Sequence, residues 1–151
     1  FVEIARPHVE TALGRPLTDE EFEVFAQIAP LVQERTKLLP EAGEQVVFLF
    51  EDFESFDPES WEKVMTKEGV AEVLAAGAAA IEGLDGWGPE AVETALREIP
   101  ERLGLGASKV FQPLRVAVTG SSVSPPLFES IAALGRERTL ERIERAREAL
   151  G

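Results

Sequence analysis

Signals that start and stop helices follow one another along almost the whole chain of 151 residues. A capping box occupies Thr18-Asp-Glu-Glu21, and Asp57-Pro58 places a typical N-cap residue before a proline at the first helical position. Glycines such as Gly69 and Gly135 follow segments whose apolar residues recur three or four positions apart. This pattern predicts an all-α fold.

The expected helices cover residues 18–29, 40–50, 58–69, 70–81, 89–99, 107–119, 126–134 and 136–149. Pro30 is expected to break the first of these or to open a new first turn, because proline has no amide donor. Pro100, with the glycines that follow it, is expected to close helix 89–99. The apolar run 46–50 could also form a buried strand, but we favour a helix because no partner strand is evident.

A polar, turn-prone segment at residues 51–58 predicts a division of the chain. We expect two small helical subdomains, one at residues 1–56, truncated at its N-terminus, and the other at residues 57–151.

Composition excludes several kinds of site. The chain has no cysteine and one histidine, His8, so that neither a catalytic triad nor a cysteine or histidine metal site can be assembled. We therefore expect no catalytic residue and no metal. No apolar run approaches the roughly 20 residues that span a membrane, and no signal peptide is recognisable. These features predict a cytoplasmic protein without membrane contact.

Charge is distributed unevenly along the chain, whose net charge is −13. Residues 101–151 carry eight basic and six acidic side chains, a net +2, whereas residues 1–100 carry seven basic and 22 acidic side chains, a net −15. The total argues against nonspecific nucleic-acid binding. The cationic side chains are nevertheless concentrated near the C-terminus, and we expect most arginines of the last helix to form a solvated face, with one or two near a nucleic-acid backbone.

Residues 107–128 combine the most informative groups of the chain. Arg115 follows Pro113 inside an apolar helical run, the hydroxyl-rich Thr119-Gly-Ser-Ser122 follows, and Ser124 is placed to cap the helix that Pro125 and Pro126 begin. A cation, hydroxyls and a helix N-terminus close together suit a phosphate or the edge of a nucleobase. An ordinary pair of capped helices, with Arg115 in a surface ion pair, would leave the same pattern.

The order of these residues resembles the C-terminal region of bacterial glutamyl-tRNA synthetases. The matching elements are Gln112-Pro-Leu-Arg115, Ala117, Thr119-Gly-Ser121, Pro125, Leu127-Phe128 and Leu134-Gly135. The resemblance implies a helical cage that binds the anticodon.

In that family the arginine of this motif and the Ser/Thr-Pro-x-Leu piece contact the first anticodon base, which implies such contacts for Arg115, Ser124, Pro125 and Leu127. The position between Pro125 and Leu127 is commonly glycine there and is Pro126 here, which stiffens the helix start. Further contacts to the RNA backbone or loop are expected from Lys37, Gln112, Thr119 and Ser121.

A second arginine, Arg35, is spaced from the aromatic run Phe48-Leu-Phe50 as in the first helical subdomain of the same family. The resemblance implies that Arg35 reads the third anticodon base, a role that suits the planar fork of guanidinium donors. A surface arginine beside Glu34 is the alternative.

The resemblance further implies that the protein recognises the anticodon loop of glutamate tRNA, and not DNA, within a monomeric ligase that attaches glutamate to its tRNA. ATP and Mg would be used by a catalytic domain elsewhere in that ligase. The present chain lacks the nucleotide-binding signatures of such enzymes, so we expect it to need no cofactor and to be inactive alone. A helical protein–protein module with an acidic surface and no RNA role is the alternative, supported by the net −15 of residues 1–100.

Overall fold

The computed structural model describes residues 2–35, 46–50, 56–122 and 124–150, and these residues contain helices and no strand. The prediction of an all-α fold is confirmed. The helices are α1 (Val2–Leu13), α2 (Asp19–Arg35), the 3-10 helix η1 (Val47–Leu49), α4 (Pro58–Ser60), the π-helix η2 (Trp61–Met65), α5 (Val70–Glu82), α6 (Pro89–Arg97), α7 (Ile99–Leu103), α8 (Ala107–Thr119), α9 (Leu127–Leu134) and α10 (Arg136–Leu150).

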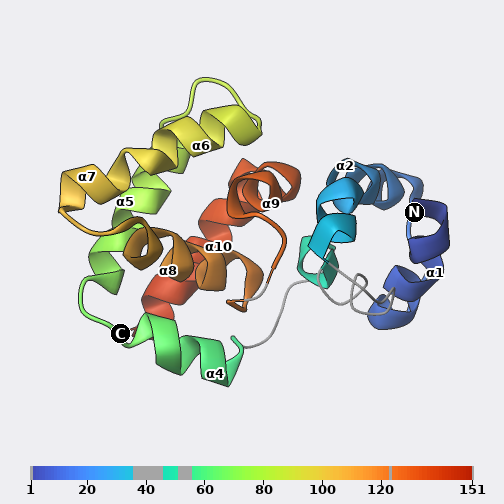
Figure 1. The fold of residues 1–151 in the computed structure, drawn as a ribbon, viewed down its shortest axis with the longest axis horizontal. Helices are drawn as coiled ribbons and strands as arrows, with labels where there is room; N and C mark the ends of the chain where they lie inside the picture. The colour runs from blue at the N-terminus through green and yellow to red at the C-terminus, as the bar shows by residue number, and fades with distance from the viewer. Residues whose placement is uncertain (1, 36–45, 51–55, 123, 151) are drawn as a thin grey trace.

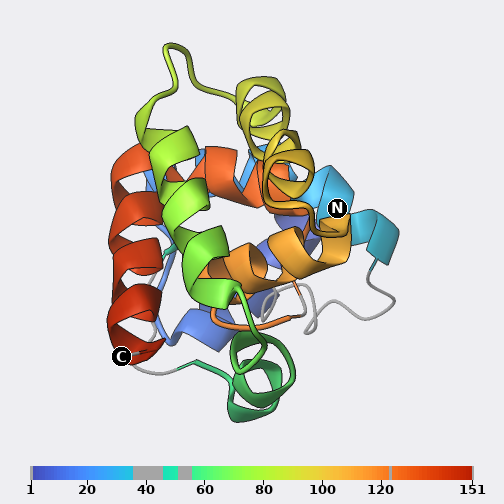
Figure 2. The same cartoon turned by 90° about the vertical axis from the view of Figure 1, so that its left-hand side faces the viewer.

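The helices form two groups that meet at α9 (Figure 1). Helices α1, α2 and η1 lie on one side of the molecule, and α4 to α10 lie on the other. Within the larger group, α5 packs against both α8 and α10, and Figure 2 shows α5 and α10 side by side. Helix α9 contacts α2 and η1 as well as α6, α8 and α10.

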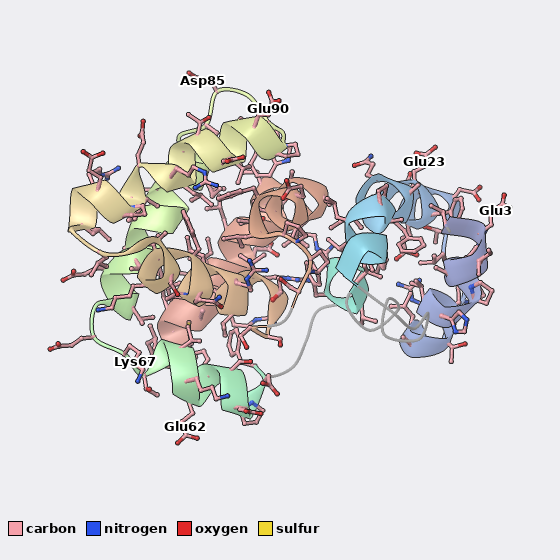
Figure 3. The ribbon with its side chains drawn as sticks, in the orientation of Figure 1. Glu3, Glu23, Glu62, Lys67, Asp85 and Glu90 are labelled. Carbon is pink, nitrogen blue, oxygen red and sulfur yellow. The ribbon has the colours of Figure 1, made fainter. Side chains whose placement is uncertain are left out.

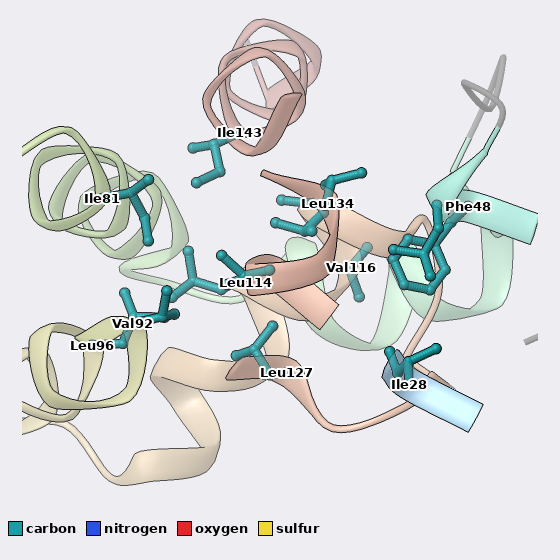
Figure 4. Close-up of a cluster of buried hydrophobic side chains, with 14 of the residues drawn as sticks. Ile28, Phe48, Ile81, Val92, Leu96, Leu114, Val116, Leu127, Leu134 and Ile143 are labelled. Carbon is teal, nitrogen blue, oxygen red and sulfur yellow. The ribbon is translucent and has the colours of Figure 1, made fainter. Parts of the chain in front are cut away.

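The apolar core runs through both groups of helices. Leu114 of α8 lies between Ile81 of α5 and Leu127 of α9 in the larger group (Figure 4), and all three are buried. Ile28 of α2 and Phe48 of η1 continue the same cluster on the other side. Burial of this apolar area is the main favourable term in folding.

Three expected helix boundaries are wrong. Pro30 neither breaks nor starts a helix but lies inside α2, where it is exposed, so that water can satisfy the carbonyl it leaves without a donor. Pro100 lies in the first turn of α7, where a missing amide costs little, and helix α6 has already ended at Arg97. Helix α9 starts at Leu127, because Pro126 keeps an extended ψ of 139°.

One expected helix is only partly covered by the described residues, and one observed helix was not expected. Most of the helix expected at 40–50 lies outside them, and its described end is the 3-10 helix η1. Helix α1 contains Pro7 and was not among the expected helices. No helix within the described residues is both long and apolar enough to cross a membrane.

The capping box at the start of α2 forms as predicted. The Glu21 amide donates to Thr18 Oγ1 over 3.2 Å, and the Thr18 amide donates to Glu21 Oε1 over 3.0 Å. Arg15 adds a two-pronged contact to the Glu21 carboxylate, with N···O distances of 2.8 and 2.9 Å. The hydrogen bonds from Arg15, assisted by those from Thr18, lower the pKa of Glu21 from 4.5 to about 2.

This shift predicts a pH-dependent contribution to stability. Because the folded pKa of Glu21 lies below its unfolded value, the contribution is complete above about pH 4.5 and is lost as the pH falls towards 2. We expect the difference in unfolding free energy between wild type and Glu21→Gln to be constant from pH 7 to 5.5 and to shrink below pH 4.5. Urea titrations at each pH measure it, and a difference independent of pH down to 2.5 would contradict the assignment.

Candidate functional site

The turn that joins α8 to α9 is held by hydrogen bonds within its own sequence. Gly120 ends α8 with a φ of 84°, a left-handed conformation that side chains disfavour, and its amide donates to Val116 O over 2.8 Å. Thr119 Oγ1 lies 2.7 Å from the Arg115 carbonyl and 2.9 Å from the Ser121 carbonyl. The hydroxyl therefore fixes how the chain leaves the helix.

Arg115 crosses this turn and joins its two ends. One guanidinium nitrogen, Nη1, donates to Ser124 Oγ over 2.6 Å and to the Pro125 carbonyl over 2.8 Å. The side chain is half-buried, so the cation is partly shielded from water. Because proline has no amide donor, residues 125 and 126 cannot brace the turn themselves, and Arg115 supplies hydrogen bonds that the backbone lacks.

The Pro125 carbonyl is the point on which this cluster converges. Ser124 Oγ donates to it over 2.8 Å, and Ser130 Oγ lies 3.3 Å from it. The expectation that Ser124 caps α9 is therefore wrong. The N-cap of α9 is Pro126, without a side-chain cap, since the helix begins too late for the Ser124 hydroxyl to reach its first amides.

A second set of hydrogen bonds ties the turn to the start of α4, about 60 residues earlier. The predicted N-cap Asp57 accepts from the Ser60 amide over 2.9 Å and from Ser60 Oγ over 2.7 Å. Ser60 Oγ in turn accepts from the Ser122 amide over 2.9 Å. The Asp57 amide also donates to the Gly120 carbonyl over 2.8 Å. The hydrogen bonds to Ser122 and Gly120 together hold residues 120–122 against the first turn of α4.

The same contacts explain the charge state of Asp57. Hydrogen bonds from the Ser60 hydroxyl and the Ser60 amide lower the pKa of its carboxyl, and the nearby Lys63 ammonium lowers it further.

The structure thus gathers the predicted residues Arg115, Thr119, Ser121, Ser124 and Pro125 at one turn. Leu127 follows at the start of α9 but is only 4% exposed, with its side chain in the core (Figure 4). Ser124 is 6% exposed, so that a ligand meets the rim of this cluster before its hydroxyl. Gln112 precedes Arg115 by three residues on α8, and its buried Oε1 has no hydrogen-bond partner among the described residues.

The second predicted group, Arg35 and Lys37, lies outside the side chains that the structure describes. Arg35 is the last residue of α2, and neither its side chain nor Lys37 belongs to the described part of the structure. Their roles stay predictions.

The arginines of α10 differ from the expected solvated face. Arg142 is 1% exposed and donates to the Val118 carbonyl of α8 over 2.9 Å. Arg136 donates to the Leu84 carbonyl over 2.5 Å, and Arg138 donates to the Leu49 carbonyl. These three side chains fasten α10 to backbone elsewhere, because a guanidinium can reach carbonyls that helix ends leave unsatisfied.

No group of three or more histidine, cysteine or acidic side chains that could hold a metal ion occurs among the described residues.

A sequence model of the family described as "Anticodon binding domain" matches residues 1–147. The chain belongs to this anticodon-binding domain family. The match includes the turn at 119–125, together with α8 and α9 on its two sides.

Curated relatives of the domain are ligases. It is 41% identical to the glutamate–tRNA ligase of Roseiflexus castenholzii over 89% of this chain and 27% of the relative, and 43% identical to that of Kocuria rhizophila over 95% of this chain and 29% of the relative. A match with the ligase of Leifsonia xyli subsp. xyli, at 41% identity, covers 100% of this chain and 32% of the relative. The chain therefore spans about a quarter to a third of the length of the relatives it matches.

The solved structures that this chain resembles are also glutamate–tRNA ligases. A glutamate tRNA ligase from Elizabethkingia meningosepticum, crystallised with its amino acid, aligns with a TM-score of 0.77 and 25% identity over 99% of this chain and 30% of that one. Glutamate-tRNA synthetase from Elizabethkingia anophelis aligns with a TM-score of 0.74 and 26% identity over 97% of this chain and 28% of that one. The resemblance stated from the sequence is confirmed, and the alternative of a protein–protein module without an RNA role is not supported.

Proposed function

We propose that the domain recognises the anticodon loop of glutamate tRNA by splaying out its unpaired bases and binding their edges. The observation that supports it most directly is the Arg115–Ser124–Pro125 cluster, which lies within the matched family region. Single-stranded RNA readers bind bases in this way, with arginine and hydroxyl groups on the edges that pairing would otherwise occupy.

In this proposal Arg115 serves the first anticodon base at the α8–α9 turn. Ser124, Pro125 and Leu127 shape the contact surface, and Thr119 and Ser121 present it at the end of α8. The hydrogen bonds that join Ser122 to Ser60 and Asp57 to Gly120 hold the turn in one conformation before RNA arrives, which reduces the entropy lost on binding.

Arg35, with Lys37 two residues later in the sequence, would serve the third base from the other group of helices. The division into subdomains at residues 1–56 and 57–151 belongs to the same proposal, because it places one base-reading arginine in each subdomain.

The domain would act within a cytoplasmic, monomeric glutamate–tRNA ligase that joins glutamate to its tRNA. ATP and Mg would be bound by the catalytic part of that ligase, and none of the residues proposed to contact the anticodon would bind them.

The test is a low-salt titration of the 151-residue chain with a glutamate-tRNA anticodon stem-loop and with a loop in which the anticodon bases are exchanged. We expect wild type to prefer the native loop and Arg115→Ala to lose about tenfold or more of that preference, since a guanidinium on a base edge contributes about 1–3 kcal/mol of discrimination. Arg115→Lys keeps the charge without the planar fork, and should lose discrimination while retaining part of the affinity.

Arg102→Ala is the matched control, because Arg102 is exposed in α7, away from the turn. Equal binding of the two loops by wild type, or a preference that survives in Arg115→Ala, would overturn the proposal. Circular dichroism of each variant verifies that the helices are intact.

A further inference from the structure

A groove of about 480 Å³ lies between the segment that follows α4 and the first turns of α8. One wall comes from η2 and the residues just after it, and the other comes from α8 and the loop before it. The lining residues are Lys63, Val64, Lys67, Glu68, Val70, Leu105, Ser108, Lys109, Gln112 and Pro113. We call this the lysine groove.

The lysine groove is positive on a strongly acidic chain. It holds three of the four lysines in the sequence, Lys63, Lys67 and Lys109, against the single carboxylate of Glu68, whereas the whole chain carries −13. Lys67 lies at the periphery just past η2, while acidic side chains such as Glu3 and Glu23 lie at the opposite end of the molecule (Figure 3). The residues that line the groove therefore carry a net charge of +2, with Glu62 close to Lys67 and Glu59 paired with Lys63 outside the lining, and positive charge attracts anions.

Two of these ammonium groups have no ion-pair partner among the described residues. Lys67 and Lys109 are both exposed and make no ion pair there. Lys63 pairs with Glu59 over 2.8 Å, but both side chains are about three-quarters exposed, and pairs of this kind contribute little and exchange readily.

The polar groups between the lysines also suit an anion. Ser108 supplies a hydroxyl, and the side-chain amide of Gln112 has an oxygen without a partner among the described residues. A half-turn of that amide presents two N–H donors instead. Gly106 starts α8 without a side-chain cap, so the positive end of the helix dipole reinforces the same region.

Helix α8 connects the lysine groove to the α8–α9 turn. Ser108, Gln112 and Arg115 stand at spacings of four and three, which places these three residues along one side of the helix, and Lys109 is the chain neighbour of Ser108. At a rise of 1.5 Å per residue, Gln112 precedes Arg115 by about 4.5 Å and Lys109 precedes it by about 9 Å along the helix axis. The groove therefore lies within about two helical turns of Arg115 on the same helix.

We propose that the lysine groove binds a phosphate of the single-stranded RNA backbone next to the bases read at the α8–α9 turn. The inference rests on the proposed function, since it takes the RNA to be present at that turn. Phosphate contacts from lysine and serine fix register and orientation without reading sequence. The groove would thus supply affinity for any loop, and the turn would supply the choice among loops.

The first measurement is the salt dependence of binding to the native and exchanged anticodon stem-loops. We expect Lys67→Gln and Lys109→Gln each to weaken binding about two- to fivefold, equally for both loops. Each should also reduce the magnitude of the slope of log Kobs against log salt by about 0.7, and the double variant by about 1.4. Arg102→Gln, which removes the same charge outside the groove, should leave the slope unchanged.

The second measurement separates this inference from the proposed function. In a ¹H–¹⁵N NMR titration of the 151-residue chain with the native stem-loop, we expect changes in the chemical shifts of the backbone amides of residues 108–112 and also of residues 119–122. Shifts at the turn alone, with unchanged salt slopes in the lysine variants, would overturn the groove and leave anticodon reading intact. Changes at the groove alone, with no preference between loops, would overturn base reading and also the placement of the bound phosphate next to bases at the turn. Absence of shifts at both places would overturn both proposals.

Discussion

Arg142→Ala is expected to lower the free energy of unfolding by about 3–5 kcal/mol, because it removes a buried cation on which packing and hydrogen bonds both depend. Arg142 is 1% exposed and is the largest fully buried side chain of the described residues. Its Nη1 donates to the Val118 carbonyl, two residues before the end of α8 at Gly120. Truncation leaves a cavity and a carbonyl without this donor at the helix that carries Arg115.

Urea unfolding followed by circular dichroism measures the loss. Arg145→Ala, an exposed position on the same helix, should cost less than about 1 kcal/mol. Arg142→Met fills much of the volume without the charge and should recover part of the stability, since apolar replacements of buried cations are often tolerated. A loss for Arg142→Ala no larger than that for Arg145→Ala would contradict the structural role.

The burial of Arg142 was not predicted from the sequence. Five of the first seven residues of the last helix, Arg136-Glu-Arg-Thr-Leu-Glu-Arg142, are basic or acidic, and such composition usually indicates a solvated face. The position of Arg142 along the helix, relative to the residues that are buried, indicates its burial. Arg142 stands three residues after Thr139 and directly before Ile143, both of which are buried. Side chains at a spacing of three share a face, so the buried stripe includes the arginine.

Local signals otherwise predicted the helices well. The capping box at Thr18 and the N-cap at Asp57 formed with the expected hydrogen bonds, because their partners are only three residues away. Prolines were the weak point. Pro30 was expected to interrupt a helix, but its cost depends on whether the freed carbonyl meets water, which the sequence alone does not specify.

In the candidate site too, contacts between residues close in sequence could be predicted, and contacts between distant residues could not. The grouping of Arg115 with Ser124 and Pro125 follows from the order of a helix, a short turn and a second helix, so sequence was sufficient to predict it. The hydrogen bond between Ser60 and Ser122 joins residues 62 positions apart, and no local sequence pattern predicts it. The lysine groove is similar, since Lys67 and Lys109 meet only after the chain has folded.

A close approach of α5 and α8 in the core gives the other large prediction. Gly77 of α5 faces Leu114 of α8, and a Cβ added at Gly77 would lie 2.4 Å from Leu114 Cδ2. Leu114 is fully buried, so its side chain has little space to move aside. Leu114→Ala is expected to cost about 3–5 kcal/mol of unfolding free energy, because burial is lost and a cavity remains.

The contact between Gly77 and Leu114 predicts that Gly77→Ala changes the free energy of unfolding in opposite directions in the wild type and in the Leu114→Ala variant. In wild type, Gly77→Ala should destabilise the domain by up to about 2 kcal/mol, since overpacking at about 1–3 kcal/mol exceeds the gain of about 1 kcal/mol in helix propensity. In the Leu114→Ala background the clash disappears and the new methyl group enters the cavity, so Gly77→Ala should stabilise by about 1 kcal/mol. A double-mutant cycle by urea unfolding measures this coupling. Equal effects of Gly77→Ala in both backgrounds would mean that α5 and α8 separate to admit the methyl group, and that their close contact does not fix the position of the helix carrying Arg115.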